Sequence, residues 1–402
     1  MRTSELEPLT EGQQLYPVDL TRGDATALNR SGLVVAQPDV DGWRVTAEYA
    51  VGAVRRGDFV VRVTPKIGIA QVLRLLARAY GVRGLHVDSE QVGVSPETDL
   101  SAVLAVLFAH EAAVSMASGP LRGYRTEDQT LPVLRGRLRL REQYLRRFGL
   151  PVPLEVTVDE WTLDTDDNRR LRAANSILLR LPEVPPRIAQ GLQRLDRLLA
   201  EVTLPTPGAP LAPWTPTRLN VRLHRFLHLA DLVLAHVSVE HLAGATETHG
   251  FVVNMAWLFE TLVARLLKEH TPAWTAQQSL PLDTQGRLTI KPDLVLQGPD
   301  GVSAVADTKY KLLDDRGNIP NPDVYQLVTY ATRLGLDSGH LIYAGDPRPP
   351  EALEIHGSQV RVHIHAVDLT RPVEDFERQV SNLADRLHLP DAYVRGVEVL
   401  AG

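Results

Sequence analysis

A segment of about twenty residues near position 300 constrains the fold of this chain more than any other feature. Residues 291–296 (Lys-Pro-Asp-Leu-Val-Leu) and 302–309 (Val-Ser-Ala-Val-Ala-Asp-Thr-Lys) are strand-like, and a Gly-Pro-Asp-Gly turn lies between them. Two such runs joined by a tight turn predict an antiparallel hairpin. If the turn is centred between Pro299 and Asp300, Asp293 lies opposite Ala306 or Asp307, where side chains come within roughly 5 Å.

The hairpin brings three chemically active side chains together. Because strand side chains alternate, Asp307 and Lys309 point to one face, which Asp293 can also reach. Two close carboxylates favour a cation, and an oxygen-only ligand set favours Mg²⁺, with Mn²⁺ as a substitute. Such an ion activates water and polarises a phosphate, and Lys309 can orient the water or stabilise the developing charge. The segment therefore predicts a phosphodiester hydrolase, although Asp-x-Lys by itself is more often a surface ion pair.

Three further residues are candidates for the same site. Glu260 lies in an otherwise apolar helix predicted at 251–269, where a buried carboxylate needs a partner such as a metal-bound water; a position on the helix surface is the alternative. Gln326 and Tyr330 lie at i and i+4 of a helix predicted at 322–334 and share one of its faces. We place Glu260 with the metal ligands and all three among the catalytic residues.

Lysine is rare in this chain, and its placement is informative. Only five of the 43 basic residues are lysine, and three of these are Lys291, Lys309 and Lys311. A compact ammonium is not interchangeable with a guanidinium, so lysine in an arginine-rich chain indicates a specific need. We predict that Lys291 and Lys311 contact nucleic acid.

Composition excludes several other functions. The chain has no cysteine, which rules out disulfides, thiolate zinc sites and a catalytic thiol. A formal net charge of −6 argues against coating nucleic acid by bulk attraction, so any DNA contact is focused in patches. The chain carries no phosphate loop of an NTPase. No signal peptide or uncharged 18-residue stretch is present, so we expect a cytoplasmic protein without membrane contact.

The best candidate patch for DNA is a row of arginines. Arg135, Arg137, Arg139 and Arg141 alternate with leucines, which predicts a strand over 134–141 with the arginines on one face. That face suits DNA phosphates. Acidic groups of another domain or of a partner protein are an equally good match.

The remaining pattern predicts several domains. A β-rich unit at 32–66 is followed by a mixed, mostly helical region, with a possible sub-boundary near 70–80. The proline-rich stretch 204–217 is typical of a linker, so we place an N-terminal region at 1–213 and a second domain at 214–402. In the second domain we expect helices at 218–238, 251–269, 322–334 and 372–387, with strands near 280, 288–296, 302–309, 340–343 and 360–365. This order predicts a mixed sheet flanked by helices, and a multidomain α/β (α+β) protein overall.

Several of these segments together resemble the McrC family, the nuclease subunits of McrBC-type, 5-methylcytosine-specific (modification-dependent) restriction systems. The resemblance rests on five segments that span most of the chain: 49–52 (Tyr-Ala-Val-Gly), 64–67 (Thr-Pro-Lys-Ile), 164–171, 254–260 and 325–330, together with the hairpin motifs Lys-Pro-Asp and Asp-Thr-Lys-Tyr-Lys.

The resemblance implies a particular division of labour. The C-terminal domain would be a PD-(D/E)xK restriction-endonuclease-like domain that cuts double-stranded DNA, and the N-terminal region would dock on a McrB-like AAA+ GTPase hexamer that recognises modified DNA. Two alternatives remain open: a stand-alone or helicase-linked nuclease that processes DNA ends, and a non-catalytic activator of an AAA+ motor.

Overall fold

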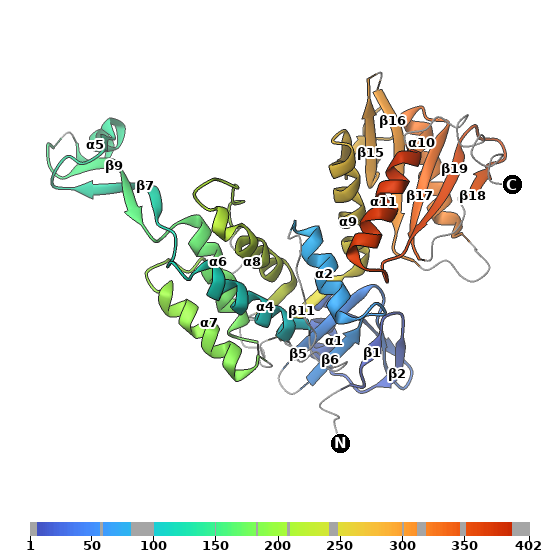
Figure 1. Ribbon diagram of the computed structural model, residues 1–402, viewed down its shortest axis with the longest axis horizontal. Helices are drawn as coiled ribbons and strands as arrows, with labels where there is room; N and C mark the ends of the chain where they lie inside the picture. Colours follow the sequence, from blue (N-terminus) through green and yellow to red (C-terminus); the bar gives the residue numbers. More distant parts are fainter. Residues whose placement is uncertain are drawn as a thin grey trace.

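The computed structural model describes residues 6–56, 59–81, 100–148, 150–181, 184–206, 210–240, 248–299, 301–311, 319–345 and 351–387. Figure 1 shows three parts within them: an N-terminal sheet unit, a helical region that carries a projecting arm, and a C-terminal sheet domain. Every helix in these ranges is too short or too polar to cross a membrane.

The N-terminal unit contains two sheets. The larger has the strand order β1 (Leu9–Thr10), β6 (Phe59–Thr64), β5 (Ala50–Arg56), β11 (Thr248–Asn254) and β10 (Val237–Glu240). The smaller has the order β2 (Gln14–Val18), β4 (Gly42–Thr46) and β3 (Val35–Asp39), and helix α1 (Arg22–Ser31) begins at a capping box formed by Thr21 and Asp24. Two strands of the larger sheet thus come from a part of the chain far beyond the other three.

The central strand pair requires a glycine. Gly52 of β5 pairs with Val252 of β11 and has a φ of +132°. A Cβ at this position would lie 1.9 Å from the carbonyl oxygen of Phe251. Only glycine allows the two backbones to approach this closely. The pairing of β5 with β11 therefore requires the glycine that ends the segment 49–52.

The helical region follows the first strands. Its helices are α2 (Ile69–Ala79), α4 (Leu100–Ser115), α6 (Asp166–Leu178), α7 (Pro186–Leu198), the short 3₁₀ helix η1 (Val221–Leu223) and α8 (His224–His236). Helix α6 begins at Thr165, whose side chain accepts a hydrogen bond from the backbone of Asn168. Helices α4, α6, α7 and α8 pack on one another.

The packing differs from the predicted division at 213/214. Helix α8 packs on α4 and α6, and β10 and β11 complete the N-terminal sheet, so the chain as far as Asn254 belongs with the N-terminal half. The predicted helix 218–238 is shorter, and residues 251–254 form a strand rather than the start of a helix. Phe251 and Val253 are buried in that strand, and helical spacing alone cannot distinguish the two placements.

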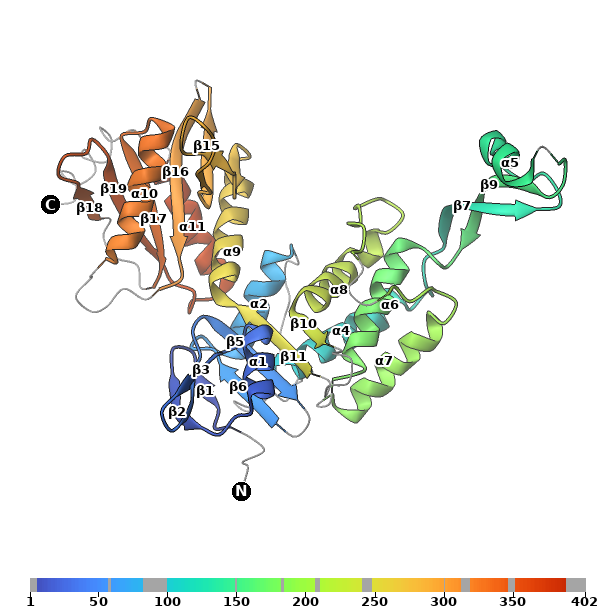
Figure 2. The ribbon, with the colours of Figure 1, turned by 180° about the vertical axis from the view of Figure 1, so that it is seen from behind.

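An arm projects from the helical region, and Figures 1 and 2 both show it at the far end from the C-terminal sheet. It consists of β7 (Gly123–Leu131), β8 (Arg137–Leu138), α5 (Leu140–Arg147) and β9 (Leu154–Thr162), and β7 pairs with β9 along its whole length. The predicted strand 134–141 is wrong, because β8 covers only two residues before α5 begins. Gly136, with a φ of +74°, lies against the carbonyl of Thr157 and turns the chain there.

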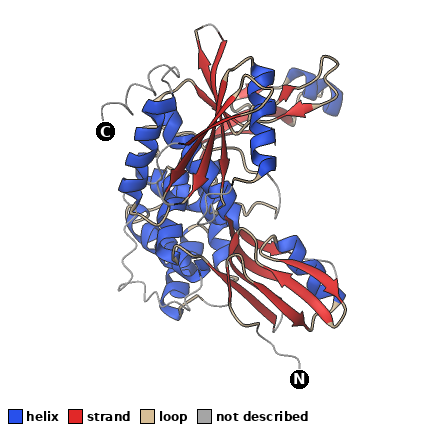
Figure 3. Cartoon of the chain, turned by 90° about the vertical axis from the view of Figure 1, so that its right-hand side faces the viewer, coloured by secondary structure: helices blue, strands red, loops and turns tan. Residues whose placement is uncertain are grey.

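The C-terminal domain has the expected mixed sheet with helices on both faces (Figure 3). The strand order is β12 (Trp274–Ala276), β15 (Leu294–Gly298), β16 (Gly301–Lys309), β17 (Ser338–Ala344), β19 (Arg361–Val367) and β18 (Glu351–Glu354). The β16–β17 and β17–β19 pairs are parallel and the other three are antiparallel. Helix α10 (Asn321–Leu334) packs on one face, while α9 (Met255–His270) and α11 (Val373–Leu387) pack on the other. Strands β13 (Leu280–Pro281) and β14 (Thr289–Ile290) form a small separate ladder.

Helix α2 joins the two halves. It packs against α9 and α11, and one continuous apolar core runs from the N-terminal sheet to these helices. At this junction the guanidinium of Arg78, only 5% exposed, forms ion pairs with Glu269 of α9 and Glu377 of α11. The C-terminal domain is therefore held to the N-terminal half by both apolar packing and charge.

Candidate active site

The predicted hairpin is present, and its register brings the acidic residues together. Strands β15 and β16 are antiparallel, with Leu294 opposite Ala306 and Val295 opposite Val305. Asp293 immediately precedes β15, so the same register places it across from Asp307. The turn residue Asp300 lies outside the described residues.

Asp293 is held from both sides. Its Oδ2 accepts hydrogen bonds from the backbone N–H and the hydroxyl of Thr308, both at 2.8 Å. Its Oδ1 accepts a hydrogen bond of 2.9 Å from Nε2 of Gln277. No sequence pattern singles out Thr308, yet its two donors fix the neighbouring Asp293 carboxylate.

Asp307 and Lys309 form the centre of the site. The Asp307 side chain is 2% exposed, and its Oδ2 lies 2.5 Å from Nζ of Lys309. Burial and the nearby Asp293 carboxylate raise the pKa of Asp307 to about 7. Burial disfavours the charged form of Lys309, but the attraction of the Asp307 carboxylate outweighs this effect, so the pKa of Lys309 is raised. The site thus concentrates negative charge that a single ammonium only partly balances.

Helix α10 supplies the second side of the site. Gln326 Oε1 accepts a hydrogen bond of 2.8 Å from Nζ of Lys309, and Gln326 Nε2 donates one of 2.7 Å to the hydroxyl of Tyr330. The Tyr330 hydroxyl in turn lies 3.5 Å from the carbonyl oxygen of Lys291. Gln326 and Tyr330, at positions i and i+4 of the helix, thereby belong to one chain of hydrogen bonds. It runs from Nζ of Lys309 to the carbonyl oxygen of Lys291.

Glu260 lies at the margin of the site. It comes from α9, and its Oε1 accepts a short hydrogen bond from Nε2 of Gln277, the same amide that binds Asp293. Burial, followed by the charge of Asp293, raises the pKa of Glu260. Glu260 therefore approaches Asp293 through the amide of Gln277, a residue that no sequence pattern had indicated.

The two outer lysines differ in their surroundings. Lys291 is exposed beside the site. Lys311 forms an ion pair with the buried carboxylate of Asp323 on α10, at 3.1 Å, and Asp323 also accepts a hydrogen bond from Tyr343. Lys311 thus has an internal partner, which anchors the segment after β16 to α10.

The arginine row lies on the arm, at the other end of the molecule from this site. Arg137 is in β8, Arg139 precedes α5 and Arg141 lies in its first turn, so the four do not share a strand face. Arg135 pairs with Glu160 at 3.2 Å, and Arg139 pairs with Asp128 at 3.1 Å. These acidic partners come from the arm itself.

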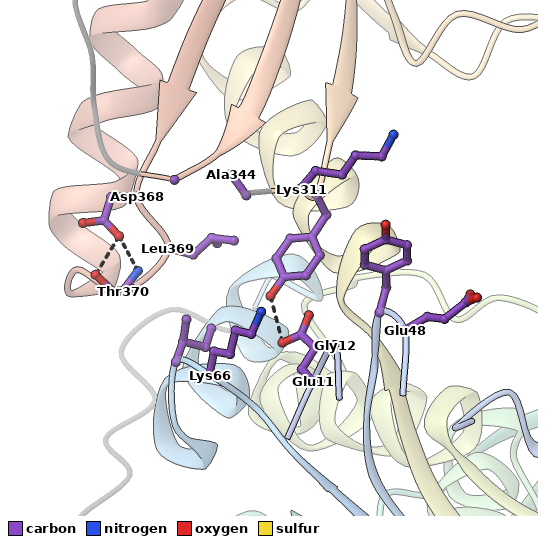
Figure 4. Close-up of a pocket in the computed structure, with 13 residues that line it drawn as sticks. Glu11, Gly12, Glu48, Lys66, Lys311, Ala344, Asp368, Leu369 and Thr370 are labelled. Atoms are coloured by element: carbon purple, nitrogen blue, oxygen red, sulfur yellow. Dashed lines mark hydrogen bonds between the residues drawn. The ribbon is translucent and has the colours of Figure 1, made fainter. Parts of the chain in front are cut away.

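A cavity of about 440 Å³ opens between the two halves next to the end of β16 (Figure 4). Tyr310, which lies between Lys309 and Lys311, donates a hydrogen bond of 3.2 Å to the buried Glu11 carboxylate of the N-terminal unit. Burial raises the pKa of Glu11, and Lys66 in the cavity wall counteracts it. The end of β16 and the residue directly after it therefore contribute to the candidate site and to the junction.

The carboxylates fit a hard divalent cation in part. Asp307 Oδ2 is fully buried without a well-aligned hydrogen-bond donor, and the charge of Asp293 adds to burial in raising the pKa of Asp307, both of which a cation would relieve. Within the described ranges no three His, Asp or Glu side chains lie close enough to hold a metal ion as they stand. Mg²⁺ is commonly bound by one or two carboxylates plus water and phosphate, so Asp293 and Asp307 suffice as its protein anchors.

The fold and the site define a mixed α/β protein with an acidic and lysine cluster on the α10 face of its C-terminal sheet. The chain belongs to the family described as McrBC 5-methylcytosine restriction system component, whose model matches residues 45–344. The resemblance found in the sequence is thereby confirmed at the level of this family.

Comparison with solved structures supports the same fold. One match is to a chain of the refined half-complex of the Thermococcus gammatolerans tetradecameric assembly of McrB AAA+ hexamers with bound McrC. The identity is 20% and the TM-score 0.58, over 95% of this chain and 99% of the other. A second match, to a chain of the Thermococcus gammatolerans McrBC complex, has 22% identity and a TM-score of 0.40, over 65% and 87% of the two chains. No curated protein matches significantly.

Proposed function

We propose that this chain is a McrC-type, Mg²⁺-dependent endonuclease subunit of a cytoplasmic, modification-dependent restriction system. Its C-terminal domain is of the PD-(D/E)xK kind and hydrolyses phosphodiesters of double-stranded DNA. The observation that carries the proposal is the meeting of Asp293, Asp307 and Lys309 on one sheet face in a chain of the McrBC family.

The site residues have distinct roles in this reaction. Asp293 and Asp307 hold the divalent ion, which supplies Lewis-acid activation of the phosphate and of water. Lys309 Nζ, oriented by Asp307 and Gln326, donates a hydrogen bond to the attacking water or to a phosphate oxygen as charge develops. Thr308 keeps Asp293 in its orientation, and Tyr330 does the same for Gln326.

We assign docking on a McrB-like AAA+ GTPase to the arm. Large apolar side chains are exposed there: Phe148 at 90%, Tyr124 at 75% and Tyr144 at 74%. Exposed apolar groups gathered on one element indicate a protein interface. The solved assembly of McrB hexamers with bound McrC has a chain of this fold, which supports such a partner.

The decisive experiment is cleavage of methylated and unmethylated plasmid with Mg²⁺, by this protein alone and together with its McrB-like partner GTPase and GTP. We expect cleavage of methylated plasmid only in the complete mixture. Cleavage by the protein alone would instead favour an end-processing nuclease.

The catalytic assignment has its own test within the same assay. Asp307→Ala should abolish cleavage while GTPase stimulation persists. If wild-type protein stimulates the GTPase without ever cutting DNA, the chain is an activator and not a nuclease.

A further inference from the structure

Gln277 has an unusual backbone conformation next to the site. It follows β12 directly and has a φ of +55°, one of two positive values among the described non-glycine residues. Its backbone N–H donates a hydrogen bond of 3.0 Å to the carbonyl oxygen of Asp293. Such a conformation costs of order 1 kcal/mol or more in a residue with a side chain, so the fold maintains it against that cost.

This conformation places the amide of Gln277 between two carboxylates. Nε2 donates to Oε1 of Glu260 and to Oδ1 of Asp293, the latter at 2.9 Å. The two acidic groups come from different elements, α9 and the start of β15, and the amide is the group that links them. It therefore lies between two acidic groups and contacts an oxygen of each.

A side-chain amide can interact favourably with such a site both when it is empty and when it holds a cation. Its NH₂ group donates to carboxylates, whereas its carbonyl oxygen is a hard ligand of the kind that Mg²⁺ and Mn²⁺ accept. Half a turn about the last side-chain bond exchanges the two. A cation bound at Asp293 would repel the NH₂ group and attract the oxygen.

We propose that Gln277 is an amide ligand of the cation site: it bridges Glu260 and Asp293 through Nε2 when the site holds no ion, and presents Oε1 to the ion when one binds. This inference rests on the proposed metal-dependent function. Among the described residues no three His, Asp or Glu side chains form a metal cluster by themselves, so an amide oxygen would add a ligand to the two carboxylates.

The test measures cation binding without any DNA. Mn²⁺ is titrated into the full-length protein, with free Mn²⁺ followed by electron paramagnetic resonance and heat by calorimetry. Gln277→Met keeps the length of the side chain but removes the oxygen, and should weaken Mn²⁺ binding about 10- to 100-fold. Gln277→Glu restores an oxygen ligand and should bind at least as tightly as wild type.

Controls separate this inference from the proposed function. Gln278→Met alters the adjacent glutamine, which contacts Thr275 and Gln297, and should leave Mn²⁺ affinity unchanged. If wild type binds Mn²⁺ and Gln277→Met binds it equally or more tightly, the amide is a spacer or competitor and the inference is wrong. If Gln277→Glu binds more weakly than wild type, it is wrong as well. If wild type binds no Mn²⁺, the proposed metal site itself fails.

Discussion

At the residue scale, the site depends on how firmly Asp293 is oriented. Thr308 gives this carboxylate two hydrogen bonds of 2.8 Å, one from the backbone and one from the hydroxyl. Only the second depends on the side chain, so the contribution of the hydroxyl can be measured separately.

Thr308→Val should lower the rate of DNA cleavage by about 3- to 10-fold, the equivalent of one hydrogen bond of roughly 1 kcal/mol. The backbone bond remains, so Mn²⁺ binding should persist. Steady-state cleavage in the presence of the partner and GTP is the measurement, and Thr329→Val on the outer part of α10 is the control. An unchanged rate would show that the backbone bond alone orients Asp293.

Sequence reasoning located part of this site and missed part of it. Asp307 and Lys309 follow from strand alternation, and Asp293 follows from the hairpin register, because both rules are local. Gln277 could not be found in this way, since its role depends on a left-handed backbone and on α9 lying beside β12. A glutamine between two predicted strands indicates neither a left-handed backbone nor the packing of a distant helix.

At the element scale, the sheet of the N-terminal unit depends on one close approach. The β5–β11 pair has room only for a hydrogen atom at position 52. A second glycine, Gly68, also has a positive φ, +78°, but apart from its chain neighbours no atom of the described residues lies within 4 Å of the position that a Cβ would take there.

The comparison of these glycines gives a prediction. Gly68→Ala should cost about 1–3 kcal/mol of unfolding free energy from backbone conformation alone, because a φ of +78° with a ψ of 150° is a combination that essentially only glycine adopts. Gly52→Ala adds a clash with the Phe251 carbonyl and should cost clearly more, with separation of β11 from β5. Thermal unfolding of the two variants measures the difference, and equal losses would contradict the role given to the close approach.

The arm exposes large apolar side chains on α5, among them Tyr144 and Phe148. Tyr144→Asp and Phe148→Asp together should leave the melting temperature almost unchanged, because the two residues are 74% and 90% exposed. They should abolish stimulation of the partner GTPase and, with it, partner-dependent cleavage. Val40→Asp, at an equally exposed position of the N-terminal unit, is the control. Full stimulation by the double variant would place the docking surface elsewhere.

Element boundaries were the weakest part of the sequence prediction. The expected helices at 322–334 and 372–387 agree closely with α10 and α11, because apolar spacing marks both and Gly335, with a φ of +72°, ends the first. The arginine row was misplaced because alternation with leucine resembles a strand, whereas Gly136 turns the chain and α5 takes up the remaining residues. The packing of β11 against β5 is a long-range contact that local patterns do not encode.

At the scale of the whole molecule, charge pairs on Arg78 hold the halves together. The Arg78 hydrogen bonds lower the pKa of Glu269 from 4.5 to about 2. A lowered pKa in the folded state means that this stabilisation is present above pH 4.5 and is lost as the pH falls toward 2. The junction should therefore weaken in acid.

Glu269→Gln should lower the melting temperature by about 1–3 °C at pH 7, since a partly exposed ion pair contributes little. The difference from wild type should shrink as the pH is lowered from 4.5 toward 2. Melting curves of the variant and of wild type across this pH range test the prediction. Glu374→Gln, on the exposed start of α11, is the control. A difference that stays constant with pH would mean that the charge of Glu269 contributes nothing.

The return of the chain through β10 and β11 has a consequence for how the protein is made. During synthesis β1, β5 and β6 leave the ribosome early, but their sheet can be completed only after the chain has been made as far as Asn254. A truncated product that stops at residue 213 ends before both late strands and before α8. Such a product should remain open to proteases, so a nonsense mutation anywhere upstream of the end of β11 removes both halves of the protein together.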